Sequence, residues 1–171
     1  MQAAPSLKNL VLVGGGHTHV HVLKSFGTKP TPGVGLTLIG RDIRTPYSGM
    51  IPGFVAGRYR FDECHIDLAG LCAWAGAHLI HDEATGIDRA GRQVLLKQGP
   101  AAAYDLLSID VGSAPNLDTI PGAAQWATPV KPIADLGRHW LAFLERMRTW
   151  LGPLNIAVIG GGAGGVELAL A

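Results

Sequence analysis

The sequence predicts an α/β protein with a parallel β-sheet and a small antiparallel β-hairpin. Two observations carry this prediction. Short apolar runs alternate with segments of helical pattern, an order typical of parallel sheets whose strands are joined by helices. Two of these runs, Leu7–Val13 and Leu154–Ile159, lead into glycine-rich turns and then into helical patterns. The chain therefore repeats one strand–turn–helix unit at a spacing large enough for two domains.

The first repeat is expected to form a βαβ unit. Strand Leu7–Val13 is followed by a helix from Gly15 to about Phe26. Prolines and glycines at residues 27–33 indicate a surface turn, and Val34–Ile39 is predicted to be a second buried strand. A right-handed crossover follows from this order of elements.

The middle of the chain mixes loops with short elements. Within residues 41–57, the stretch Thr45–Gly53 holds two prolines and two glycines, which argues against a long helix there. Beyond them the pattern predicts, in order, a helix Ile66–Gly76 with Asp67 at its start, a strand Ala77–His81, a hairpin Ile87–Leu96 that turns at Ala90–Gly91, and a strand Tyr104–Asp110.

The C-terminal part begins with an amphipathic pattern. Apolar residues recur at helical spacing over Ile133–Leu151, which predicts a helix with one buried face. We expect residues 1–130 to form a first domain and residues 131–153 a connecting helix. Residues 154–171 are expected to be the start of a second domain, truncated after Ala171.

Both glycine-rich turns have a spacing that suits a nucleotide diphosphate. In such turns the first glycine allows a tight turn, the second lets the backbone approach the phosphates, and the third lets the helix pack on the strand. The later turn keeps all three, as Gly160, Gly162 and Gly165. The earlier turn keeps Gly14 and Gly16, but His19 takes the third place. We expect this histidine to hold the helix off its strand or to turn its ring outward.

Composition narrows the classes of function. The net charge is +1, with no basic stripe or polybasic cluster, so we expect neither nucleic acid nor an anionic membrane as partner. No apolar run reaches the ~18–20 residues of a transmembrane segment. The two cysteines, Cys64 and Cys72, are too few for a disulfide framework. We therefore expect a cytoplasmic protein, with peripheral attachment to a membrane as an alternative.

The motifs, in their order, resemble those of a known family. The run Gly14–Leu23 (GGGHTHVHVL), the segment Thr45–Met50 (TPYSGM) and the later turn resemble the pyridine nucleotide–disulfide oxidoreductase superfamily. The chain looks most similar to the branch of type II NADH dehydrogenases and sulfide:quinone oxidoreductases, and more closely still to the flavoprotein module fused to selenide, water dikinase. The resemblance implies a Rossmann-like FAD-binding domain and the start of a second, Rossmann-like NAD(P)-binding domain.

The resemblance also implies which residues bind the cofactors. FAD would contact the first turn, the segment after the second strand, the start of the hairpin region and the place where the chain leaves the first domain. The implied FAD-binding residues are Gly14, Gly15, Gly16, His17, Thr18, Arg41, Asp42, Pro46, Ser48, Ala84 and Gly112. The implied residues for NAD(P)H, in the complete protein, are Gly160, Gly162 and Gly165.

Two departures from the family pattern affect the expected FAD site. Gly40 stands where an acidic residue should bind the ribose, so Asp42 would have to serve from two positions further along. Asp110 and Val111 replace the small pair that precedes Gly112 in the family, which puts the contact there in doubt.

The implied activity is that of an FAD-dependent NAD(P)H oxidoreductase. Hydride would pass from NAD(P)H to FAD, and electrons would go on to an acceptor such as a quinone or a sulfur or selenium compound. We assign no catalytic residue and expect no metal site. Two alternatives stay open: a non-catalytic nucleotide-binding sensor or scaffold in a larger fusion protein, and a domain that binds NAD alone. Residues 1–171 by themselves are expected to be inactive and to hold FAD weakly, and a fused C-terminal domain is compatible with the resemblance.

Overall fold

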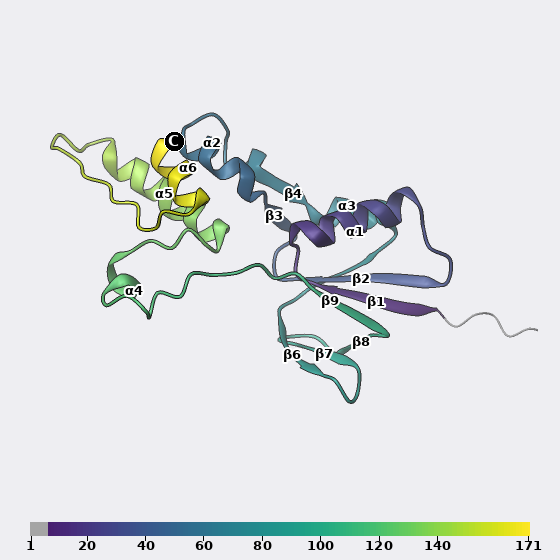
Figure 1. Cartoon of the computed structure of the whole chain (residues 1–171). Helices are drawn as coiled ribbons and strands as arrows, with labels where there is room; N and C mark the ends of the chain where they lie inside the picture. The colour runs from purple at the N-terminus through teal and green to yellow at the C-terminus, as the bar shows by residue number, and fades with distance from the viewer. Residues whose placement is uncertain (1–6) are drawn as a thin grey trace, which may run out of the picture. The chain divides into compact units, whose positions relative to one another are not determined.

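The computed structural model describes residues 7–171, which divide into two compact units (Figure 1). Unit 1 comprises residues 7–45 and Ile66–Gly112, and unit 2 comprises Pro46–His65 and Ser113–Ala171. The division does not follow chain order, because residues 46–65 group with the C-terminal part. Residues 1–6 of the expected first domain lie outside the described residues, and the expected boundaries near residues 130 and 153 stay predictions.

Unit 1 is built on a four-stranded parallel sheet in the order β5-β2-β1-β9. The strands are β1 Lys8–Val13, β2 Val34–Gly40, β5 His78–His81 and β9 Leu106–Ile109. Val13 lies opposite both Ile39 and Ile109, and Gly40 lies opposite His81. The carboxyl ends of all four strands therefore share one edge of the sheet. The parallel sheet predicted from the apolar runs is confirmed.

Two helices cover one face of this sheet (Figure 1), α1 His17–Thr28 and α3 Leu68–Ala75. Leu12 and Leu38 of the sheet pack there against Leu23 of α1. Capping residues mark both ends of helix α3. The Asp67 carboxylate accepts the Gly70 N–H at 3.1 Å, and Gly76 ends the helix in the left-handed conformation, with φ +65°.

A small antiparallel sheet covers the opposite face (Figure 1). Its strands are β6 Ala84–Asp88, β7 Gln93–Leu96 and β8 Ala102–Ala103. Val94 of β7 packs against Val11 and Ile39 of the parallel sheet. The predicted hairpin is confirmed as the β6–β7 pair. Strand β8 was not expected, since two alanines carry no alternating pattern.

The chain passes between the units through two short strands, β3 Arg44–Pro46 and β4 His65–Asp67, which pair with each other. Because Ile66 belongs to β4, helix α3 begins two residues later than the sequence suggested. Residues 41–57 contain no long helix, as their prolines and glycines predict: besides β3 they hold two short helical turns, η1 Ser48–Met50 and α2 Ile51–Val55.

Unit 2 is helical. Besides η1 and α2 it contains η2 Asp62–Cys64, α4 Ala123–Trp126, α5 Ile133–Met147 and α6 Ala163–Leu170. Its core joins Ile51, Phe54 and Cys64 to the apolar faces of α5 and α6. The predicted amphipathic helix is confirmed but ends at Met147, before the Gly152–Pro153 pair that disfavours continuation.

One predicted element is wrong in the described chain. Residues 154–159 were expected to form a strand, yet they form none, and their side chains are exposed. A strand needs a neighbour to pair its N–H and C=O groups, and none of residues 7–171 pairs with this segment. The turn and helix α6 that follow it still form. None of the helices in the described residues has the length and apolar character needed to cross a membrane.

The packing of α1 on the sheet gives a test of the fold. Leu23 is fully buried, so Leu23→Ala should lower the free energy of unfolding by about 2–5 kcal/mol, through lost burial and the cavity left behind. Leu106→Ala is the matched control in the same unit, because the Leu106 side chain is 64% exposed. This substitution should lower the free energy of unfolding by only about 0.5 kcal/mol. Denaturant unfolding of the two variants measures the difference, and equal losses would contradict the described core.

Candidate functional site

The loops that follow the parallel strands converge at the carboxyl edge of the sheet. The Gly14 N–H donates to the Ile39 carbonyl at 2.8 Å, and the Asp110 N–H donates to the Val13 carbonyl at 2.8 Å. The Asp82 N–H reaches the Gly40 carbonyl at 3.1 Å. Hydrogen bonding thus continues past the strand ends and fixes the first residues of each loop. In open α/β sheets, ligands bind at this edge.

The turn between β1 and α1 is shaped by glycine. Gly14 has φ +94°, a conformation that other residues rarely adopt. A Cβ on Gly14 would lie 2.3 Å from the Asp110 carbonyl oxygen, so the turn has no room for a side chain. Gly16 is extended, with φ −67° and ψ 170°, and caps helix α1, where the Val20 N–H donates to its carbonyl at 3.1 Å.

The turn before α6 has the same local backbone. Gly160 has φ +116°. Gly162 caps α6 with φ −71° and ψ 169°, and the Val166 N–H donates to its carbonyl at 3.1 Å. A Cβ on Gly165 would lie 2.1 Å from the Gly160 carbonyl oxygen, so here the third glycine allows the helix to approach the turn. Two segments far apart in sequence therefore fold into turns with equivalent local backbone, although among the described residues only the first turn follows a strand.

In the first turn His19 stands at the position of the third glycine. Its ring is fully buried, with Nδ1 2.7 Å from the Gly14 carbonyl and Nε2 2.9 Å from Ser108 Oγ. A carbonyl only accepts, so Nδ1 carries a proton. The expectation of an outward ring is wrong, because two polar partners satisfy the ring inside. The alternative expectation, a helix held slightly off its strand, stays a prediction.

Asp110 is the residue that sequence reasoning left out of the site. Its Oδ2 accepts the Thr18 N–H at 2.9 Å, at the beginning of α1. A Cβ on Gly16 would lie 2.2 Å from the Asp110 Cγ, so the carboxyl group rests against that glycine. The signal that could have found it is positional, since Asp110 is a charged residue at the carboxyl end of a strand that neighbours β1.

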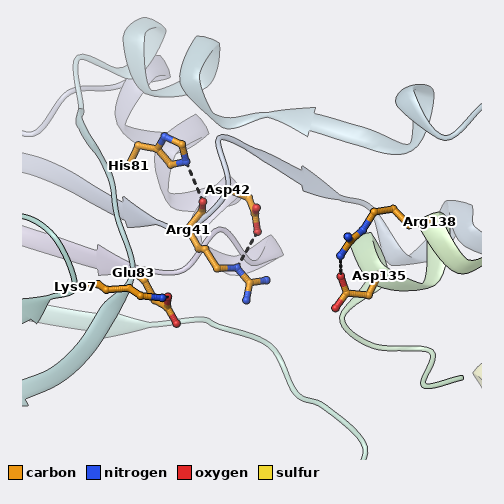
Figure 2. Close-up of polar contacts among 7 residues, drawn as sticks. All are labelled: Arg41, Asp42, His81, Glu83, Lys97, Asp135 and Arg138. Carbon is orange, nitrogen blue, oxygen red and sulfur yellow. Dashed lines mark hydrogen bonds and ion pairs between the residues drawn. The ribbon is translucent and has the colours of Figure 1, made fainter. Parts of the chain in front are cut away.

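Charged side chains gather beyond β2 and β5 (Figure 2). Arg41 Nε donates to Asp42 Oδ2 at 3.3 Å, and His81 Nε2 lies 3.0 Å from the Arg41 carbonyl. Lys97 donates to Glu83 at 2.7 Å, and this bond, with the charge of Lys97 and a contribution from Arg41, holds the pKa of Glu83 below its ordinary value. Asp42 is exposed and keeps carboxylate surface available to a ligand.

The other predicted residues divide between the units. Unit 1 holds, at or after its strand ends, Gly14, Gly15, Gly16, His17, Thr18, Arg41, Asp42, Ala84 and Gly112. Ala84 begins β6 at a register shift between Ala84 and Gly86, and Gly112 has φ +76°. Pro46 and Ser48 belong to unit 2, as do Gly160, Gly162 and Gly165.

The cysteines have the character of core residues. Cys64 and Cys72 are free and buried. Cys64 Sγ donates to the Arg60 carbonyl at 3.5 Å. Burial, with a smaller contribution from the charge of Asp67, raises the pKa of Cys72 to about 11. Neither thiol is an activated nucleophile. Among residues 7–171, no group of three or more His, Cys, Asp or Glu side chains is placed to hold a metal ion.

A parallel sheet with a glycine turn at its carboxyl edge, and a second equivalent turn further along, defines a dinucleotide-binding α/β protein. The sequence matches the family described as pyridine nucleotide-disulphide oxidoreductase over residues 8–171, and the chain belongs to this family. Members of the family bind FAD and NAD(P)H.

Several known proteins are similar to this chain. The alternative NAD(P)H-ubiquinone oxidoreductase C1, chloroplastic/mitochondrial, of Arabidopsis thaliana is 38% identical over 86 residues, which are 48% of this chain and 17% of the relative. The sulfide:quinone oxidoreductase structure from Aquifex aeolicus has a TM-score of 0.67 at 20% identity, covering 83% of this chain and 33% of that one. The reduced CoADR-RHD structure from Bacillus anthracis has a TM-score of 0.78 at 20% identity, covering 95% and 30%. The structures share the fold, and the chain spans a third or less of the length of each relative.

The tight first turn leads to a prediction about two glycines. Gly14→Ala should lower the free energy of unfolding by about 3–5 kcal/mol, since it adds a clash with backbone to a strained φ. Gly33→Ala should lower the free energy of unfolding by only about 1–2 kcal/mol. Gly33 also has a positive φ, of +77°, but no described atom lies within 4 Å of an added Cβ, so no clash is added. Chemical denaturation compares the variants. Equal costs would mean that Gly14 is needed for its φ alone.

The buried Cys72 thiol predicts a pH dependence of stability. Below pH 9 the thiol is neutral in both states and has no effect. Above the ordinary pKa of 9.0 it ionises in the unfolded chain but stays protonated in the folded chain until about 11. The free energy of unfolding should therefore fall by about 2–3 kcal/mol across this window through Cys72 alone. Urea titrations at several pH values should show a shallower decline for Cys72→Ala than for the unmodified chain, and parallel curves would refute the prediction.

Proposed function

We propose that this chain provides the FAD-binding part, and the start of the NAD(P)H-binding part, of an FAD-dependent NAD(P)H oxidoreductase. In the complete protein, hydride passes from NAD(P)H to FAD and electrons go on to an acceptor such as a quinone or a sulfur or selenium compound. FAD supplies the redox chemistry, and the protein supplies binding and orientation. The membership of the family supports the class of activity.

The observation that carries this proposal is the shared conformation of the two turns. Gly14 and Gly160 both have a left-handed φ, and Gly16 and Gly162 both cap a helix in an extended conformation. In each turn a glycine caps the helix that follows and brings no side chain of its own to the first helical N–H groups, which is the arrangement that binds a diphosphate. Two such turns in one chain fit two dinucleotides.

The residues of unit 1 fit the parts of FAD in order. The N–H groups of His17 and Thr18 would hold the diphosphate, with Gly14, Gly15 and Gly16 keeping the approach open. Asp42, beside Arg41, would bind the ribose, because Gly40 stands at the position where the family has an acidic residue. The irregular backbone at Ala84 would contact the adenine. Gly112 would contact FAD at the point where the chain leaves the FAD-binding domain.

The remaining residues proposed to bind the cofactors belong to unit 2. Pro46 and Ser48 would contact the flavin region, and the turn with Gly160, Gly162 and Gly165 would hold the diphosphate of NAD(P)H. The relative from Arabidopsis thaliana is named for NAD(P)H and ubiquinone, which supports a quinone as the first acceptor to test. A cytoplasmic location, with peripheral attachment to a membrane, would suit a protein that reduces a quinone.

A non-catalytic sensor or scaffold is the second candidate. The observation that favours it is the Asp110 carboxylate at the first turn, where a diphosphate would bind. Within residues 7–171, Cys64 and Cys72 are both free and buried, so these two thiols offer no redox pair to relay electrons. A sensor would bind the nucleotides without reducing the flavin.

The test uses the complete protein that contains this chain. It should purify with FAD that can be extracted and identified, and NADH or NADPH should bleach the flavin absorption in the absence of oxygen. Gly162→Ala should weaken NAD(P)H binding roughly tenfold, because the added methyl group would meet the bound ligand. The variant should still fold and keep its FAD, because no described atom lies within 4 Å of the added Cβ.

The matched control is Gly164→Ala, which lies just after the turn at the start of α6 and is equally open, at a position that the diphosphate motif does not restrict. It should leave the reduction of the flavin unchanged. Bound FAD that NADH and NADPH both fail to reduce would overturn the oxidoreductase and favour the sensor. A protein without FAD would overturn the assignment of the first turn.

A further inference from the structure

The Asp110 carboxylate occupies the space above the first glycine turn. Its Oδ2 accepts the Thr18 N–H at 2.9 Å. A Cβ placed on Gly16 would meet Cγ at 2.2 Å and both carboxylate oxygens at 2.3 Å, so the group lies against the bare backbone of that glycine. This is the face of the turn that a glycine leaves open for phosphate.

The backbone of Asp110 is held independently of its side chain. Its N–H donates to the Val13 carbonyl at 2.8 Å, and its carbonyl accepts the Gly16 N–H at 3.1 Å. The side chain can therefore leave the turn by rotation about its own bonds, without breaking the link between β9 and β1. The segment that follows, residues 111–116, is exposed and leaves room for such a movement.

Helix α1 gains an anion from this arrangement. In the described chain Gly16 offers no side-chain cap, and the first turn of α1 contains no acidic residue. The Asp110 carboxylate supplies the negative charge that a helix N-terminus favours. A dinucleotide diphosphate needs the same N–H groups and carries two negative charges, so both anions cannot hold the Thr18 N–H together.

We propose that Asp110 is a built-in competitor of the diphosphate: it caps α1 when the first turn is empty and must swing away when FAD binds. This inference rests on the proposed function, since it assigns the affinity of the same FAD site. Binding of FAD then exchanges one anion for another at the helix start. The affinity is set by the difference between the two interactions, so the complete protein releases FAD more readily than the turn alone would allow.

The experiment is an FAD titration of the flavin-free complete protein, followed by calorimetry. Asp110→Ala should lower the Kd for FAD roughly tenfold, and Asp110→Asn, which keeps an accepting oxygen without the charge, should lower it less. Both variants should melt at a lower temperature than the unmodified protein when FAD is absent, because α1 loses its anion. Opposite effects on affinity and stability separate this role from a purely structural one.

Asp105→Asn is the control. Asp105 lies just before the start of the same strand, β9, where it accepts from Lys8 and from the Asn9 N–H, so the variant makes the same change in charge at the other edge of the sheet. It should leave the Kd unchanged. If Asp110→Asn and Asp110→Ala bind FAD as the unmodified protein does, or more weakly, the inference is overturned while the proposed function stands. If no variant and no unmodified protein binds FAD, the proposed function fails and the inference fails with it.

Discussion

The close approach of the β1–α1 turn to the end of β9 is the constraint on which the candidate site depends. The Gly16 N–H donates to the Asp110 carbonyl, and the Asp110 N–H donates to the Val13 carbonyl. These bonds bring the two segments so near that a Cβ on Gly14 would lie 2.3 Å from the Asp110 carbonyl oxygen. Glycine is therefore needed at this position for space as well as for conformation. The start of α1, and every group that it presents, follows from this contact.

The two turns show how one backbone shape can be kept by different side chains. In the later turn, Gly165 lets α6 approach the Gly160 carbonyl directly. In the first turn, His19 takes that place, and its buried ring bridges the Gly14 carbonyl and Ser108. The carbonyl that would otherwise lie under the helix thus receives a hydrogen bond from the ring. A buried polar ring is tolerated because both of its nitrogens have partners.

The chemistry available to this chain comes from backbone groups more than from reactive side chains. Cys72 is kept protonated by burial, and Glu83 is paired with Lys97. The groups at the sheet edge that could bind a ligand are the first N–H groups of α1, of which the Thr18 N–H is bonded to Asp110, and the exposed Asp42. Such a site positions a cofactor and leaves the redox chemistry to it. This agrees with the family to which the chain belongs.

The amino-acid sequence by itself determined the strands of the parallel sheet, the β6–β7 hairpin, the α1 and α3 helices and both glycine turns, because these depend on local pattern, on caps such as Asp67, and on the absence of side chains. It did not determine the strand expected at residues 154–159, since a strand exists only where a neighbour pairs with it. Nor did it place Asp110 on Gly16 or the His19 ring inside the core, contacts that join residues about ninety positions apart. Those were decided by the tertiary structure, because only the pairing of β9 with β1 brings the two segments together.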